Sequence, residues 1–448
     1  MHSATVFGSG RSAIIKYNSA VHAKQIETTL RSLERRASVY YFRIPRKVVL
    51  ALALLVLAPW AVLIVLSSHS RFSFALSGSA AAAPTRSDKR YCKPGPWGNI
   101  EYFDIVTRPP DELISPSFFA EAQPVWVFKG YSKAGLYELL TSAELTEAQR
   151  IAIDSSLEFS AAANQCVVKP GRELIMGLSP KARARIYAVL AKFPENPPQR
   201  DPFIFRPAQL NGWLDEAGLQ PHSVDLVKSL LHPHGDLVLF SDCNTVMSQL
   251  PNADENVRLL KALFRRNAVF PRLRVSADSD IKQLTSYWGK GGREMVVGPL
   301  LESIPKTTNG ITVDVALLLP PFVRERLYTY PLPTPETKGL SRDCHWSALN
   351  FFNEHPDDRF GRFDQIYPAI QNGYYPVPGR PSFGDLVLFF APDHNIIHSA
   401  VYVADDIFFT KNGPHFTSPW LLATQAEVLA AFPAYDKLEV NYYRPKKL

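Results

Sequence analysis

Short apolar or alternating segments mark the C-terminal part of the chain as a β-sheet region. Alternation is typical of strands, because successive side chains of a strand point to opposite faces. The predicted strands are 385–390, 397–403, 407–411 and 437–443. The helical pattern WSALNFF precedes them. A helix followed by strands that short turns connect predicts an α+β domain with an antiparallel sheet over residues 326–448.

Apolar residues at helical spacing dominate the region before this domain. Its clearest helix starts carry residues that favour helix N-termini: Ser179 before Pro180, Asn252, and Asp280. We therefore expect residues 91–325 to form a mostly helical domain. The same signals predict a further helix over 419–431, with Ser418 as its cap.

One apolar run, residues 48–66, contains no charged residue. A run of about 20 apolar residues is long enough to cross a bilayer as a helix. A cleaved signal peptide with a processing region at 79–83, and a buried core helix, are the alternatives. The preceding basic segment is too long for a usual signal, and few globular helices are apolar on all sides. We therefore expect a membrane anchor.

The charge distribution orients this anchor. Residues 1–47 hold nine basic and two acidic residues, which accounts for the net charge of +7 of the whole chain. The positive-inside rule then predicts a cytoplasmic tail over 1–47, a transmembrane helix over 48–67, a linker over 68–90 and external domains after it. The rest of the chain is near neutral, which argues against a nucleic-acid-binding domain.

Cys344 is the strongest candidate for a reactive residue. It stands where Ser341-Arg342-Asp343 gives way to the predicted helix. A helix N-terminus favours the thiolate through its dipole, and the backbone N–H of Cys344 is suitably placed to bind an oxyanion. The alternative is that a single cysteine before a tryptophan is a packed core residue.

His398 supplies the candidate base, because it begins an otherwise apolar strand. His394 lies nearby but in a loop. If residues 404–406 form a three-residue hairpin loop, Val403 pairs with Ile407, and His398 then lies opposite Asn412, with Thr410 diagonal to it. Either polar side chain can orient the imidazole. In this register, Asn412→Ala is expected to slow turnover far more than Thr410→Ala. A two-residue loop would instead bring Lys411 and Gly413 to the face of His398.

Three motifs occur in a familiar order: Asp343-Cys344 before a helix, Gly384-Asp385 before a strand, and His398-Ser399 in the next strand. This order is similar to that of the NlpC/P60 group of papain-like cysteine peptidases, over about residues 326–415. The resemblance implies Cys344 as nucleophile, His398 as base, and Thr410 or Asn412 as the third residue. It also implies a tyrosine near the oxyanion, for which Tyr330 or Tyr328 is the nearest match.

The resemblance further implies cleavage of amide bonds in bacterial cell-wall peptides. Together with the orientation predicted from the charges, this puts the expected activity at the outer face of the inner membrane. The chain departs from the family where His345-Trp346 replaces the usual Ser-Gly after the cysteine, and where the usual third histidine has no counterpart. A catalytically inactive envelope scaffold and an acyltransferase or amidase on the same fold are the alternatives. Thiolate chemistry requires no metal, so no cofactor is expected.

The remaining polar clusters are weaker candidates. His232, His234 and Asp242 resemble metal ligands in type, but no further ligand stands at the expected spacing. Cys243 follows an aspartate as Cys344 does, but it ends an apparent strand, so we interpret it as structural. External cysteines can oxidise, and at most one disulfide can form among Cys92, Cys166 and Cys243 if Cys344 is free.

Overall fold

The computed structural model describes residues 89–115, 123–332, 341–435 and 437–448. The predicted cytoplasmic tail and the predicted transmembrane helix lie outside these residues, as does the linker up to residue 88. Within the described residues, no helix combines the length and the hydrophobicity that a membrane crossing requires.

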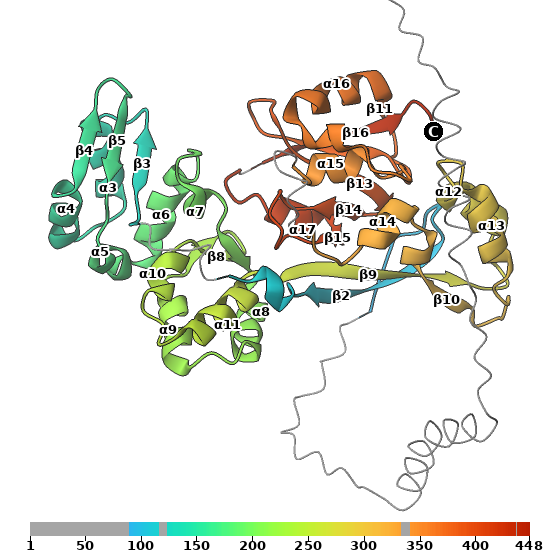
Figure 1. The fold of residues 1–448 in the computed structure, drawn as a ribbon, viewed down its shortest axis with the longest axis horizontal. Helices are drawn as coiled ribbons and strands as arrows, with labels where there is room; N and C mark the ends of the chain where they lie inside the picture. The colour runs from blue at the N-terminus through green and yellow to red at the C-terminus, as the bar shows by residue number, and fades with distance from the viewer. Residues whose placement is uncertain (1–88, 116–122, 333–340, 436) are drawn as a thin grey trace, which may run out of the picture. The chain divides into compact units, whose positions relative to one another are not determined.

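A six-stranded antiparallel sheet forms the C-terminal part of the protein (Figure 1). Its strands, in the order in which they pair, are β11 (Tyr374–Pro376), β16 (Glu439–Pro445), β12 (Leu386–Phe390), β13 (Ile396–Ala404), β14 (Ile407–Lys411) and β15 (Trp420–Thr424). Three α-helices belong to this region: α15 (Cys344–Leu349), α16 (Phe363–Gly373) and α17 (Gln425–Ala430). The predicted α+β class with an antiparallel sheet is therefore confirmed.

The segment after β14 differs from its prediction. Residues 419–431 were expected to form one helix after Ser418, but residues 420–424 pair with β14 as β15, and only 425–430 are helical. The helix cap is Thr424, which accepts a hydrogen bond from Glu427 N–H. All five residues of β15 are buried, and a short continuous apolar run cannot be assigned to strand or helix by periodicity alone.

A second antiparallel sheet contains two long strands that are far apart in sequence. It consists of β1 (Arg90–Tyr91), β2 (Asn99–Thr107), β9 (Arg266–Val275) and β10 (Ile311–Asp314). β2 pairs with β9 along its whole length, from Asn99 opposite Arg274 to Thr107 opposite Arg266. Residues 108–265, which we call the inserted module, are therefore an insertion between two paired strands.

The inserted module contains two three-stranded sheets: β3 (Trp126–Lys129), β5 (Gln165–Val168) and β4 (Leu157–Ser160), then β6 (Phe203–Phe205), β8 (Leu237–Phe240) and β7 (His232–His234). Its helices are η1 (Asp111–Leu113), α3 (Lys133–Ser142), α4 (Glu147–Asp154), α5 (Arg172–Gly177), α6 (Pro180–Leu190), α7 (Pro197–Arg200), α8 (Pro207–Glu216), α9 (Pro221–Ser229), α10 (Cys243–Met247) and α11 (Ala253–Leu263). The expectation of a mostly helical middle region missed these six short strands, each of which has only three or four residues.

Four of the remaining helices follow β9 or β10: α12 (Ile281–Trp288), α13 (Glu294–Glu302), η3 (Val315–Leu318) and α14 (Pro321–Arg326). The short helix η5 (Asp358–Gly361) lies between α15 and α16. The predicted caps are confirmed: Ser179 caps α6, Asn252 caps α11 and Asp280 caps α12. Each side chain accepts a hydrogen bond from the backbone N–H three residues later, which satisfies a donor that the helix itself leaves free.

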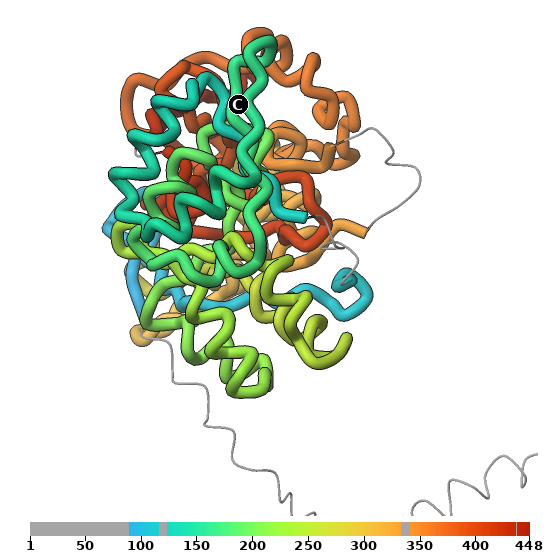
Figure 2. The backbone as a smooth tube through the Cα atoms, turned by 90° about the vertical axis from the view of Figure 1, so that its left-hand side faces the viewer, coloured from blue at the N-terminus to red at the C-terminus, as the bar shows by residue number. Residues whose placement is uncertain are grey.

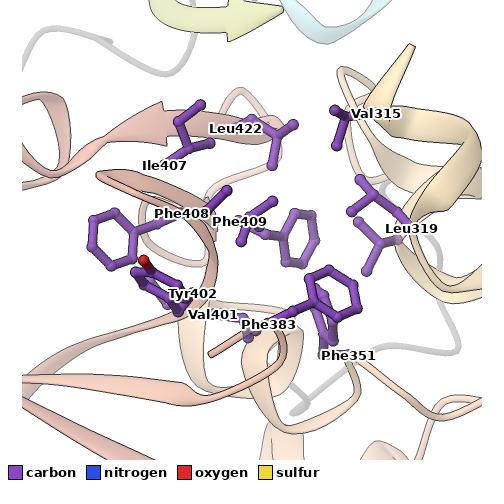
Figure 3. Close-up of a cluster of buried hydrophobic side chains, with 14 of the residues drawn as sticks. Val315, Leu319, Phe351, Phe383, Val401, Tyr402, Ile407, Phe408, Phe409 and Leu422 are labelled. Atoms are coloured by element: carbon purple, nitrogen blue, oxygen red, sulfur yellow. The ribbon is translucent and has the colours of Figure 1, made fainter. Parts of the chain in front are cut away.

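Two hydrophobic clusters form the interior. One lies within the inserted module, and Figure 2 shows the green backbone of this module in front of the orange and red C-terminal elements. The other combines β2, β9, α12 and α13 with the six-stranded sheet. Figure 3 shows Phe409 of β14 surrounded by Leu319, Phe351 and Leu422. Both sides of the predicted boundary at residues 325/326 thus contribute to the second cluster.

Candidate active site

Cys344 is the first residue of α15. The Asp343 carboxylate caps this helix, because its Oδ1 accepts hydrogen bonds from the backbone N–H groups of His345 (2.9 Å) and Trp346 (3.1 Å). Ser341 Oγ donates to the other carboxylate oxygen at 2.9 Å. The predicted position of the thiol at a helix start is therefore confirmed.

The Cys344 thiol is buried, with 6% of the residue exposed. The pKa of Cys344 is raised to about 12, mostly by burial and also by the negative charge of Asp343. Backbone hydrogen bonds from Ser399 and His345 and the charge of Lys411 partly offset this rise. The thiol is therefore protonated at neutral pH in this conformation. Its contact with the backbone of Ser399 puts it beside the residue that follows His398.

His398 lies in β13 with 1% of its surface exposed. Its Nε2 shares a hydrogen bond of 2.7 Å with Thr410 Oγ1, and its ring packs against Phe389 and Phe432 at centroid distances of 5.4 and 5.0 Å. Burial lowers the pKa of His398 to about 3, and the charge of His345 acts in the same direction. The imidazole is therefore neutral at physiological pH, and Thr410 holds its ring.

The β13–β14 hairpin explains why Thr410 and not Asn412 binds the imidazole. The loop has two residues, because Ala404 pairs with Ile407, but a β-bulge at Val403 restores the predicted register, with Val401 opposite Phe409. β14 ends at Lys411, so Asn412 leaves the strand. The expected hydrogen bond between Asn412 and His398 is therefore absent from the described part of the chain, and the diagonal partner forms instead.

The structure does not join Cys344 and His398 by a hydrogen bond within the residues it describes. Side chains alternate along a strand, so Ser399 and His398 point to opposite faces of β13. Ser399 Oγ shares a hydrogen bond of 2.6 Å with Nδ1 of His345, which is the second residue of α15. Sequence reasoning missed this buried pair, since it depends on how α15 packs on β13.

Tyr330 and Tyr328, the candidates for a tyrosine near the oxyanion, lie against the long β2–β9 pair. Burial raises the pKa of Tyr330, and its neighbours Thr107 and Arg266 lower it. The Tyr328 hydroxyl donates a hydrogen bond to the carbonyl of Val269 in β9. In the described part of the chain, neither hydroxyl is hydrogen-bonded to Cys344, so the contacts give no support to the expected role.

Lys411 is a buried cation near the thiol that the sequence reasoning did not assign to the site. None of its surface is exposed, and its Nζ donates to the carbonyls of Gly413 (2.6 Å) and His415 (3.0 Å). Burial lowers the pKa of Lys411 to about 8, while the charges of Cys344 and Asp343 raise it. A lysine at the end of an otherwise apolar strand was the signal that could have pointed to it.

Asp385 of the Gly-Asp motif has a structural role. It is fully buried at the start of β12, and both of its carboxylate oxygens accept hydrogen bonds from Arg444 of β16, at 2.8 and 2.7 Å. The backbone N–H of Ser382 donates to the same carboxylate at 2.7 Å. A bidentate ion pair of this kind holds β16 against β12.

The weaker candidates take structural positions. Asp242 lies 3.2 Å from the Arg183 guanidinium and accepts a hydrogen bond of 2.6 Å from the Tyr187 hydroxyl. No group of three metal-ligating side chains occurs in the part of the chain that the structure describes. Cys243 opens the helix α10, which corrects our interpretation that it ends a strand. All four cysteines are free thiols.

No protein-family model, curated protein or solved structure matches this chain. The similarity to NlpC/P60 peptidases therefore rests on the motifs around Cys344, Asp385 and His398 and on the order of the elements that carry them.

Proposed function

We propose that this protein is a cysteine hydrolase with Cys344 as nucleophile and His398 as base. The observation that carries the proposal is the 2.7 Å hydrogen bond between His398 and Thr410, one residue along β13 from Ser399, whose backbone contacts the cysteine that opens α15. Fixing the ring through Nε2 leaves Nδ1 to receive a proton, which is how a third residue orients a catalytic histidine.

The reaction follows the usual course of thiol acyl transfer. A local opening must first bring the Cys344 thiol and the His398 imidazole together. The sulfur then attacks the amide carbonyl and its proton passes to the imidazole, which gives that proton to the departing amine. Water hydrolyses the resulting thioester and regenerates the thiol. Asp343 already accepts from the N–H groups of His345 and Trp346, so the N–H of Cys344 is the helix-terminal donor that remains for the oxyanion.

The substrate that we propose is the peptide portion of bacterial cell wall, and the site of action is the outer face of the inner membrane. The resemblance to NlpC/P60 peptidases supports this substrate class, and the basic segment before the apolar run 48–66 supports the location. An acyltransferase or amidase acting through the same thioester differs only in the acceptor, which product analysis identifies.

A second candidate is an envelope scaffold without catalytic activity. The pKa of about 12 for the Cys344 thiol favours it, because only the thiolate is a strong nucleophile. The burial of Cys344 and His398 favours it as well, since a substrate reaches neither group without a local opening.

Turnover of purified cell-wall peptides by the full-length protein, followed by mass spectrometry, tests both candidates. We expect Cys344→Ala to reduce cleavage by on the order of 10³-fold or more and Cys243→Ala to leave it unchanged. Absence of cleavage by the wild-type protein would favour the scaffold. In that case, the alkylation rate of Cys344 by iodoacetamide should rise without a plateau up to about pH 9, with or without His398→Ala.

A further inference from the structure

A large cavity lies apart from the thiol, where the inserted module faces the end of the six-stranded sheet. Its volume is about 660 Å³, which is in the range of small-molecule sites. Phe203 and Phe240 of the module, Arg266 at the start of β9, and Asn412 and His415 after β14 are among its lining residues. Cys344 does not line the cavity.

The cavity wall contains three arginines, of which two are already neutralised. Arg206 lies 2.7 Å from the Glu427 carboxylate, and Arg265 lies 3.4 Å from that of Glu216. Arg266 has no carboxylate partner among the described residues, since its Nη1 donates only to backbone carbonyls. Arg266 is therefore the lining arginine that lacks a carboxylate partner among the described residues.

Three further polar atoms at the wall lack hydrogen-bond partners among the described residues. Ser241 Oγ belongs to a residue that is 7% exposed, and Arg265 Nε to one that is 4% exposed. Neither atom has a hydrogen-bond partner within the residues that the structure describes, and the same holds for Oδ1 of Asn412. A buried polar group without a partner is costly to the folded state, so a ligand that binds these groups recovers part of that cost.

Aromatic rings form the apolar part of the wall. Phe203 packs edge-on against Phe264 at a centroid distance of 5.4 Å, and Phe264 stacks on His415 at 6.0 Å. Rings arranged in this way offer flat apolar faces next to the arginine. The acidic side chains of Asp201 and Glu427 also line the cavity and disfavour a ligand with two or more negative charges.

We propose that this cavity binds a small organic monoanion, with a flat apolar body against the aromatic rings and a carboxylate that Arg266 receives. A guanidinium matches a carboxylate in geometry, and the single unpaired charge selects one negative group. The site is independent of the cysteine chemistry, so Cys344→Ala should bind the same ligands with unchanged affinity.

Isothermal titration calorimetry of the full-length protein with N-benzoylglycine, and with its uncharged amide, tests the proposal. We expect the acid to bind at least about tenfold more tightly than the amide, as a charge-assisted hydrogen bond provides. Arg266→Gln should reduce the affinity for the acid to that for the amide. Arg362→Gln removes an exposed arginine that pairs with Asp364 outside the cavity, and it should change neither affinity.

Equal affinities for acid and amide, absence of binding by both, or the same loss in Arg362→Gln would each overturn the proposal. If Arg266→Gln fails to fold, Asn412→Asp provides the second variant. It adds a negative charge at the cavity wall, so it should weaken binding of the acid about tenfold and leave the amide unchanged. Unchanged binding of the acid by this variant would equally refute an anion site.

Discussion

Two aspartate–cysteine pairs begin helices in this protein, and their surroundings differ. Asp343 caps α15 with its carboxylate, whereas Asp242 makes no side-chain hydrogen bond to α10. Asp242 instead pairs with the buried Arg183 and Tyr187. The same dipeptide thus supports a candidate site in one place and a structural ion pair in the other. What distinguishes them is the set of side chains that the tertiary fold brings to each.

Breaking the Asp242 pair should have the largest effect. Asp242→Ala leaves the fully buried Arg183 guanidinium without a carboxylate, so we expect the free energy of unfolding to fall by about 3–5 kcal/mol. Urea denaturation measures this loss. In the matched double variant Arg183→Met/Asp242→Leu, apolar side chains replace both charges, and most of the stability should return. A loss below about 1 kcal/mol in Asp242→Ala would show that this pair is not the structural centre of the module.

The inserted module and the candidate site each contain a buried neutral histidine. Lowering the pH should reduce the stability of the protein by a similar amount through each of them. Burial lowers the pKa of His232 and of His398 to about 3 each, from an unfolded value near 6.5. The folded protein therefore binds fewer protons than the unfolded chain between these values. The stability from each histidine is fully present above pH 6.5 and declines as the pH falls toward 3, by up to about 1.4 kcal/mol per pH unit.

Urea denaturation between pH 7 and pH 4.5 checks this expectation. His232→Gln and His398→Gln should each make the decline with falling pH shallower, by a similar amount. If only His398→Gln does so, a buried histidine with a lowered pKa is a property of the candidate site and not of the inserted module. If neither does, the side chains are more accessible to protons than the structure indicates.

Much of the C-terminal region was predictable because its signals are local. The alternation of residues 397–403 fixed β13, and the five-residue segment 407–411 became β14 as expected. Continuing the register from Val401 opposite Phe409 put Thr410 within reach of His398. Local sequence therefore predicted β13 and β14, and it gave Thr410 as one of the two possible hydrogen-bond partners of His398.

The rest depends on contacts between distant segments. β2 and β9 pair across an insertion of more than 150 residues, and no local pattern indicates that they meet. Likewise, the packing of α15 against β13 and β14 brings the buried Lys411 side chain near the thiol of Cys344. Tertiary packing therefore decides which polar side chains lie near Cys344, and no local sequence pattern predicts them.

The hydrogen bond at His398 provides a more moderate test. Thr410→Val keeps the shape of the side chain and removes the hydroxyl that holds Nε2, so we expect kcat/KM for cell-wall peptides to fall about tenfold. Asn412→Ala should change it less than twofold, because Asn412 has left the strand. The ¹⁵N chemical shift of His398 Nε2 should also change in Thr410→Val alone. A larger loss of kcat/KM in Asn412→Ala than in Thr410→Val would indicate that Asn412, and not Thr410, orients His398 during turnover.

The smallest expected effects concern Asp343 and Asp242, the aspartates that precede the two cysteines. Asp343→Ala removes the cap of α15 and should cost about 1 kcal/mol of stability, whereas Asp343→Asn retains an acceptor and should cost less. The charge of Asp343 raises the pKa of Cys344, so both variants should make the thiol easier to ionise and speed its alkylation at pH 8. Asp242 raises the pKa of Cys243 in the same way, and burial raises it more. Cys243 is 3% exposed against 6% for Cys344, so Asp242→Asn should speed its alkylation less. If Asp343→Asn leaves the alkylation rate of Cys344 unchanged, the carboxylate acts only as a helix cap, and the two aspartate–cysteine pairs differ in structure but not in their effect on the thiol.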